Sequence, residues 1–428
     1  MDVVTAFLAG ELNEEVYIKM PEHMVERFGR YARVLKSLYG LKQAARVWYL
    51  LLSEFLVSIG FTCLPTDQTI FRNDKTKVVI GIHVDDLIIT GPSNQEIENL
   101  KEKLNKRFRM KDLGIARNVL GVRITQKDDY LMIDQSQYAR SIVNDFAMSG
   151  TKIYSTPMAS DAVGELERTP GRPCTNEELA SYWKLLGKLM YLCNTRPDII
   201  FETHKMAQYS HKACHNHWIA LLRILSYVEG TIDYGTRYGR GDIETPYYKV
   251  DNNIEVYCGS SRSTDLVTFA DSDYAGDPGD RKSITGVIMM LNGGAVAAIS
   301  KKQTSVATST TNAEYIAASE GAKLAIWGDM LISHITGSPR KSIPLLLEDN
   351  KACIQLKGGV SNTSKIKHVD VAYHHIVDEI NKGKLESRWV KGDHMLADGL
   401  TKPLPGPNFK LKRAAIGAVE IMEADQQG

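Results

Sequence analysis

The feature that most constrains the fold is a pair of adjacent carboxylates, Asp85 and Asp86, inside the otherwise apolar run VVIGIHVDDLIITG (78–91). The aliphatic residues on both sides of the pair predict two strands of a β-hairpin, with the aspartates at its turn. An ionised carboxylate in an apolar setting is costly unless a partner or a metal ion neutralises it. Taken alone, the pair is explained by a solvent-exposed Asp-Asp turn, and a metal-binding role requires further acidic residues nearby.

Composition excludes one class of protein and leaves others open. The 428 residues suggest about two or three domains, and 43% hydrophobic residues supply enough material for their cores. Lys and Arg number 52 and Asp and Glu 51, for a net charge of +1, which excludes a strongly basic nucleic-acid binder but not a local basic groove. The basic segment KEKLNKRFRMK (101–111) is explained by a solvated helix face.

The cysteines and histidines do not indicate a zinc-stabilised or a secreted protein. Six cysteines are scattered without a paired framework, which is typical of a reducing compartment, and we find no secretory signal and no bilayer-spanning apolar run. The segment HKACHNHW contains His211, Cys214, His215 and His217, a density that raises the possibility of zinc. No second cluster with finger spacing accompanies it, and a helical pattern runs through it, so zinc is the minor alternative.

Changes in sequence pattern divide the chain into four expected segments. Residues 1–125 mix short β patterns with helices, including the amphipathic pattern NQEIENLKEKLNKRF, and residues 126–260 are dominated by helices. Residues 261–404 contain strands, a hairpin signal at NGG, a helix, a buried strand and a further helix, which predicts a compact α/β domain. Residues 405–428 are expected to form a C-terminal tail. The predicted fold class is α/β, of the α+β type.

Four acidic residues of the last third lie where predicted strands and helices begin or end. Asp271 follows the apolar strand LVTFA, Glu314 lies in the first turn of the next helix, Asp349 closes IPLLLED, and Asp398 lies in LADGLTKPL. Each has an ordinary explanation: Glu314 can form a capping box with Thr311, and the aspartates can be turn residues. Their joint order favours one anionic pocket, and oxygen ligands suit Mg²⁺.

The motifs resemble copia-type retrotransposon polyproteins over residues 1 to about 404. MDVVTAFLAGELNEEVYIKMP, SLYGLKQAARVWY, HVDDLII and RMKDLG are similar to the reverse transcriptase of that family. ADSDYAGDPGDRKSITG, KKQTSVATSTTNAEYIA, LEDNKACIQL, KHVDVAYHHI and LADGLTKPL are similar to its RNase H domain. The resemblance therefore implies a partial reverse-transcriptase palm in 1–125, a helical thumb or connection region in 126–260, and an RNase H-like α/β domain in 261–404.

For the polymerase, the resemblance implies that Asp2, Asp85 and Asp86 are catalytic, with Asp2 and Asp85 as the main metal ligands. Two Mg²⁺ ions, or Mn²⁺, would make such a carboxylate cluster tolerable and would activate the primer hydroxyl and neutralise the triphosphate. His83 stands where the family usually has tyrosine. The expected substrate-binding residues of this half are Phe7 (a steric gate, or an ordinary core residue), Lys42, Gln43 and Lys111 (a triphosphate contact, or a helix cap).

For the nuclease, the resemblance implies that Asp271, Glu314, Asp349 and Asp398 are both catalytic residues and metal ligands for two further ions. His368, in KHVDVAYHHI, is the expected substrate-binding residue. The implied partners are an RNA template, a DNA primer, an RNA–DNA hybrid and deoxynucleoside triphosphates, with no membrane. The expected location is intracellular, in a cytoplasmic virus-like particle or in the nucleus.

The start of the sequence bears on how well each site is assembled. Asp2 has one residue before it, so we expect its strand to lack an upstream half and the fingers of the polymerase to be absent. A strand truncated at a catalytic ligand should fray. We therefore expect the RNase H site to be better assembled than the polymerase site. The alternative is a decayed, inert element that acts at most as a nucleic-acid-binding domain.

Overall fold

The computed structural model describes residues 1–148, 150, 152–239, 248–251, 254–256, 266–339, 343–354 and 367–421. At 248–251, 254–256, 352 and 367–373 it describes the backbone alone. The chain forms two compact units, one of residues 1–116 with 330–340, the other of residues 117–329 with 341–428. No helix among the described residues is long and apolar enough to span a membrane.

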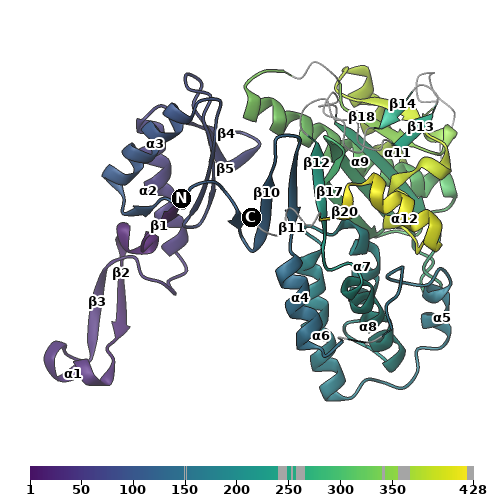
Figure 1. Cartoon of the computed structure of the whole chain (residues 1–428), viewed down its shortest axis with the longest axis horizontal. Helices are drawn as coiled ribbons and strands as arrows, with labels where there is room; N and C mark the ends of the chain where they lie inside the picture. Colours follow the sequence, from purple (N-terminus) through teal and green to yellow (C-terminus); the bar gives the residue numbers. More distant parts are fainter. Residues whose placement is uncertain are drawn as a thin grey trace. The chain divides into compact units, whose positions relative to one another are not determined.

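The first unit is built on a six-stranded sheet in the order β4-β5-β6-β7-β1-β8. Its strands are β4 (Thr62–Leu64), β5 (Asp67–Arg72), β6 (Val79–His83), β7 (Asp86–Thr90), β1 (Asp2–Val3) and β8 (Met110–Lys111). Helices α2 (Ala44–Ser58) and α3 (Asn94–Arg107) pack on this sheet through one apolar core. After η1 (Ala6–Ala9), strands β2 (Glu11–Lys19) and β3 (Tyr31–Lys36) form a separate hairpin with α1 (Glu22–Phe28) at its far end (Figure 1).

Local sequence patterns explain two elements of this unit, and both were predicted. Strands β6 and β7 pair as a hairpin from Val79↔Thr90 to His83↔Asp86, so Asp85 lies in the turn, whereas Asp86, also expected in the turn, is the first residue of β7. Helix α3 begins after Ser93, whose hydroxyl accepts the Glu96 amide, and it buries Leu100 and Leu104 one turn apart.

The second unit contains a helical layer beside a five-stranded sheet ordered β20-β12-β11-β10-β9. The strands are β9 (Asn118–Val119), β10 (Val122–Gln126), β11 (Tyr130–Asp134), β12 (Tyr234–Gly239) and β20 (Ala418–Glu420). The helices are α4 (Ser136–Asp145), α5 (Ala162–Arg168), α6 (Asn176–Leu192), η2 (Pro197–Ile199), α7 (Ile200–Gln208) and α8 (His215–Glu229). Figure 1 shows α4, α6 and α8 side by side, and they share one apolar core.

The other large sheet of this unit has five strands in the order β17-β16-β15-β18-β19. They are β15 (Val267–Asp273), β16 (Ile284–Leu291), β17 (Gly294–Lys302), β18 (Leu345–Glu348) and β19 (Glu386–Trp389). Strands β15, β16 and β17 are antiparallel, whereas β18 and β19 run parallel to β15. Asn292 and Gly293 join β16 to β17 with positive φ angles of 50° and 78°, as a tight hairpin turn requires. The predicted α/β organisation and its NGG hairpin are confirmed.

Helix α9 (Thr310–Thr336) covers one face of this sheet through small residues. Ala317, Ala318 and Ala322 pack against Ala270 and Leu346 of the central strands. The other described elements of this region are β13 (Tyr248–Asp251), β14 (Ile254–Val256), α10 (Lys351–Ile354), α11 (Lys367–Asn381), η4 (Gly392–His394) and η5 (Leu396–Leu400).

The chain beyond residue 404, expected to be a tail, contains regular structure. Residues 406–415 form α12 (Gly406–Ala415), and β20 pairs with β12 from Tyr234↔Glu420 to Thr236↔Ala418. Phe409 of α12 enters the apolar core of the helical layer, and Ala415 enters the core under the β15 sheet. Burial of these side chains is what orders a segment whose own pattern is too short to predict an element.

Candidate active site

The strand register brings Asp271 and Asp349 together. Strands β15 and β18 are parallel, and their last pair is Phe269↔Leu347. Side chains alternate along a strand, so residues two positions beyond a pair share the face of that pair. Asp271 and Asp349 are therefore neighbours at the end of two adjacent strands.

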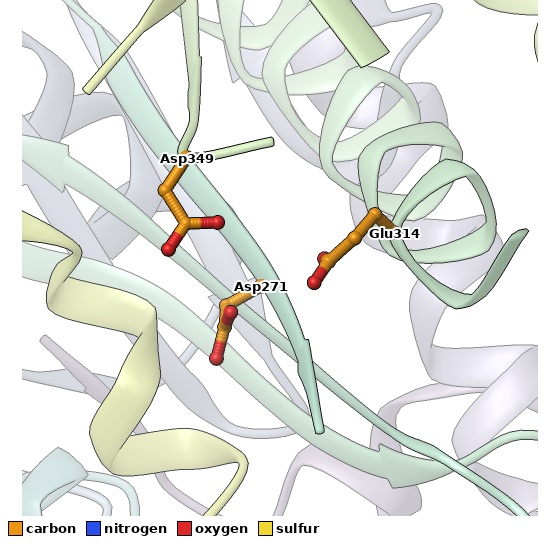
Figure 2. A group of neighbouring side chains, drawn as sticks. All are labelled: Asp271, Glu314 and Asp349. Carbon is orange, nitrogen blue, oxygen red and sulfur yellow. The ribbon is translucent and has the colours of Figure 1, made fainter. Parts of the chain in front are cut away.

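Helix α9 adds a third acid to this position. The helix starts beside the strand ends, where Ser309 Oγ accepts the Asn312 amide at 3.1 Å. The geometry argues against a capping box between Glu314 and Thr311, because the Glu314 side chain is buried beside Glu348. Figure 2 shows Glu314 pointing from the helix toward Asp271 and Asp349.

These three side chains form the carboxylate group: Asp271, Glu314 and Asp349. One oxygen of each lies within 4.8 Å of the others, an arrangement that could hold a metal ion. Asp271 is 3% exposed and Glu314 8% exposed, while Asp349 is half-buried. Among the described residues, this is the one group of three or more His, Cys, Asp or Glu side chains whose possible ligand atoms lie this close together.

A fourth acid at the site, Glu348, was missed by sequence reasoning. It is 1% exposed, one of its oxygens accepts the Asn350 amide at 2.5 Å, and its negative charge helps to raise the pKa of Glu314. Alternation would direct Glu348 away from Asp349, toward the α9 face. The available signal was the double acid in IPLLLED, which places one carboxylate on each face of the sheet end.

Burial and mutual repulsion make the ionised state of these acids unfavourable. Burial beside Glu348 raises the pKa of Glu314 to about 10, and burial raises the pKa of Glu348 to about 8. Burial, with Asp398 as the next cause, raises the pKa of Asp271 to about 7 and also raises the pKa of Asp349. A bound cation would reverse this effect, because it favours the charged carboxylates.

Unsatisfied oxygens test whether these residues fit a divalent cation. Glu314 Oε2 and Glu348 Oε1 are buried without a hydrogen-bond partner. Buried polar atoms are normally paired, so two orphaned carboxylate oxygens at one place call for a ligand. Oxygen-only donors of this kind suit Mg²⁺ or Mn²⁺, and the site fits such an ion.

Asp398 lies beside the carboxylate group but is not one of the three acids within 4.8 Å. Its Oδ1 receives Lys402 Nζ at 2.7 Å, and its Oδ2 is paired with Lys412 Nζ. Thr401 connects this segment to the group, because its hydroxyl donates to Asp271 Oδ2 at 2.6 Å. Of the four predicted nuclease acids, three thus converge and the fourth adjoins them through Thr401.

A glycine makes room for the segment that carries Asp398. Gly286 of β16 pairs with Asp271. A Cβ at this position would lie 2.6 Å from Thr401 Cγ2 and 2.8 Å from the Ala397 carbonyl oxygen. Any larger residue would push η5 away from Asp271.

The acids predicted for the polymerase lie on adjacent strands of the sheet of the first unit and in its hairpin turn. Strand β1 lies between β7 and β8, with Asp2 paired to Asp86 and to Lys111. The Val3 amide donates to the Asp85 carbonyl at 2.9 Å, and Trp48 Nε1 donates to the Val84 carbonyl at 2.7 Å. In the described part of the chain, however, these aspartates are not among the acids whose oxygens meet within 4.8 Å.

The substrate-binding residues predicted for the polymerase all lie in the first unit, whereas the one predicted for the nuclease lies in the second. Phe7, in η1, packs against the apolar core and lies 4.7 Å from the Tyr39 ring, measured between centroids. Lys42 is exposed and Gln43 is half-buried immediately before α2, while Lys111 is exposed on β8 beside Asp2. His368 belongs to α11, but its side chain lies outside the described residues.

The histidine-rich segment has structural roles. His217 Nδ1 accepts the Cys214 amide at 3.0 Å at the start of α8, and its ring stacks on Tyr209 with 4.0 Å between centroids. His215 Nδ1 lies 3.1 Å from Glu178 Oε1. Within the described ranges these side chains do not form a group of metal-ligand atoms, so the observed geometry favours helix capping over zinc.

Comparison with known proteins identifies the family. Residues 1–160 match the family described as reverse transcriptase (RNA-dependent DNA polymerase). The chain is 32% identical to the retrovirus-related Pol polyprotein from transposon TNT 1-94 of Nicotiana tabacum, over 97% of this chain and 30% of that protein. It is 30% identical to the Pol polyprotein from transposon RE2 of Arabidopsis thaliana, over 98% of this chain and 28% of that protein.

The chain thus spans less than a third of the length of these relatives. Among solved structures, a foamy viral protease-reverse transcriptase in complex with double-stranded DNA is 11% identical, with a TM-score of 0.48, over 91% of this chain and 56% of that one. The sequence matches confirm the resemblance found in the motifs: the chain belongs to the family of copia-type retrotransposon Pol polyproteins.

Proposed function

We propose that the second unit is a ribonuclease H, which hydrolyses the RNA strand of an RNA–DNA hybrid. The observation that carries this proposal is the convergence of Asp271, Glu314 and Asp349 at one edge of a sheet, with buried carboxylate oxygens left unpaired. Family membership supports it, since the sequence similarity to Pol polyproteins extends across nearly the whole chain.

Asp271, Glu314 and Asp349 would hold divalent cations, with Asp398, the fourth acid predicted from the sequence, as a further ligand. Bound Mg²⁺ or Mn²⁺ supplies activation of a water molecule and stabilisation of the leaving oxygen. The chain contributes orientation: Thr401 fixes the Asp271 carboxylate by its hydrogen bond, and the Asn350 amide fixes Glu348. The hybrid would be held through its backbone and 2′-hydroxyl groups, with His368 as a proposed contact, so sequence preference should be weak.

Hybrid cleavage by the purified chain tests this proposal. With Mg²⁺ or Mn²⁺, we expect wild-type protein to cut the RNA strand, and Asp271→Asn or Glu314→Gln to lose activity by about 100-fold or more, because even outer-shell changes cost about 10–100-fold. Glu320→Gln is the matched control on the same helix, since Glu320 pairs with Lys323 at the surface. Cleavage that survives Asp271→Asn would exclude the carboxylate group as the site.

The first unit is proposed to be the RNA-directed DNA polymerase, with Asp2, Asp85 and Asp86 at its centre. The pairing of β1 with the hairpin favours this second function, because it puts Asp2 opposite Asp86. The proposed substrates are a DNA primer on an RNA template and deoxynucleoside triphosphates. The proposed contacts are Phe7 as a gate against the 2′-hydroxyl, with Lys42, Gln43 and Lys111.

The two activities are proposed to differ in strength. Asp271, Glu314 and Asp349 lie within metal-binding distance of one another, so we expect hybrid cleavage to be the stronger activity. Primer extension and hybrid cleavage, measured on the same preparation, show which activity is stronger. Robust extension without cleavage would reverse the order proposed here. A folded chain with neither activity and no Mg²⁺-dependent rise in melting temperature would instead identify a decayed element, since a formed site must be stabilised by its ligand.

A further inference from the structure

The Asp398 carboxylate is held between two lysines that differ in exposure. Lys402 Nζ lies 2.7 Å from Oδ1, and Lys412 Nζ contacts Oδ2. The Lys402 side chain is 47% exposed, whereas the Lys412 side chain is 3% exposed. One oxygen of Asp398 is therefore covered by a cation at the surface, and the other by a cation fixed inside the fold.

Lys412 has further partners that fix its position. Its ammonium donates to the Met395 carbonyl at 2.7 Å and lies 3.5 Å from the Gly392 carbonyl oxygen. Both carbonyls belong to the irregular segment that leads into η5, which has no strand ladder to hold it. Lys412 thus joins helix α12 to the segment that presents Asp398.

The opposite side of that segment is tied to the carboxylate group. The Thr401 amide donates to the Asp398 carbonyl at 3.1 Å, and the Thr401 hydroxyl donates to Asp271. The close approach at Gly286 leaves little space for η5 to move toward the sheet. Asp398 is consequently positioned from two sides, by Thr401 near Asp271 and by Lys412 from α12.

We propose that Lys412 is a positioning residue of the nuclease site, which holds Asp398 beside Asp271, and that Lys402 is a displaceable cation on the same carboxylate. The proposal rests on the proposed ribonuclease function, because it assumes that divalent cations bind at this site. A divalent cation that uses Asp398 must compete with Lys402 for Oδ1. Lys412 need not move, because the Asp398 Oδ2 atom and the two carbonyl oxygens that it contacts lie on the buried side.

Electrostatics alone and a positioning role predict opposite changes in cation affinity when Lys412 is removed. Removing either positive charge makes the site more negative, which by itself would tighten cation binding. If Lys412 positions Asp398, its removal must weaken cation binding despite the more negative charge. Removing Lys402 should tighten binding on either account, because it also removes the competitor.

The test is Mn²⁺ binding to the full chain, measured from the electron paramagnetic resonance signal of free Mn²⁺ for wild type, Lys412→Met, Lys402→Met and Lys410→Met. Lys410 is the matched control, exposed on the same helix α12. We expect about tenfold weaker binding in Lys412→Met, the lower end of the effect of losing an outer-shell partner. We expect tighter binding in Lys402→Met and no change in Lys410→Met.

Two further measurements separate positioning from general loss of structure. Melting in EDTA identifies variants that do not fold. If Lys412→Met does not fold, Lys412→Gln, which keeps a hydrogen-bond donor, replaces it. In an Asp398→Asn background, Lys412→Met should cause no further loss of Mn²⁺ affinity, since its effect acts through Asp398. Tighter or unchanged Mn²⁺ binding in every Lys412 variant that folds would overturn the proposal. Wild-type protein that binds no Mn²⁺ would instead refute the proposed function itself.

Discussion

The substitution Glu314→Gln should stabilise the metal-free chain while abolishing its response to Mg²⁺. Burial raises the pKa of Glu314 from 4.5 to about 10, so at pH 7 the folded chain must keep a proton that the unfolded chain has released. At pH 7, which lies 2.5 pH units above 4.5, this costs about 3 kcal/mol at ~1.4 kcal/mol per pH unit. Glutamine is neutral in both states and removes most of that cost.

The sign of the pH dependence follows from the raised pKa. Below pH 4.5 the carboxyl is protonated in both states and costs nothing. As pH rises toward the folded pKa of about 10, the metal-free wild-type chain loses stability, and Glu314→Gln loses less. The difference between the two proteins should therefore widen from pH 5 to pH 8.

Urea unfolding in EDTA, followed by circular dichroism and tryptophan fluorescence, measures this difference. Trp389 is a local reporter, because its indole donates to the Asp349 carbonyl at 2.8 Å. Adding Mg²⁺ should stabilise the wild type and leave Glu314→Gln nearly unchanged, with Glu320→Gln behaving as wild type. A Glu314→Gln protein that is less stable than wild type in EDTA would refute the reasoning from burial and repulsion.

Three further substitutions test other parts of the structure. Asp198→Asn leaves the buried Arg196 guanidinium without its bidentate partner, at 2.9 and 2.8 Å, and should cost about 3–5 kcal/mol in urea unfolding; a loss below 1 kcal/mol would contradict it. Gly286→Ala forces a methyl group to within 2.8 Å of a facing carbonyl and should cost about 1–3 kcal/mol and impair hybrid cleavage, whereas Gly187→Ala, with open space around it, should not destabilise. Trp48→Phe removes the donor, at 2.7 Å, to the carbonyl in the aspartate turn and should lower primer extension more than hybrid cleavage; equal losses would argue against a local effect.

The candidate sites were predicted unevenly, for reasons that lie in particular residues. Asp271, Glu314 and Asp349 were found because each lies at the boundary of an element that its own neighbours define. Glu348 was missed because its partner, Glu314, is remote in sequence. Lys412 was missed because the segment around it carries no strong periodic pattern, and its burial depends on the turn that carries Asp398.

The sequence by itself determined the local elements and the family. The hairpin of β6 and β7, the Asn292–Gly293 turn and the amphipathic face of α3 follow from short-range steric preferences and from the spacing of apolar residues. Only the tertiary structure decided which acids share a site, that β20 closes the edge of a sheet, and that α12 supports Asp398. The physical reason is that backbone preferences act over a few residues, whereas charge neutralisation and burial depend on partners that long-range packing brings together.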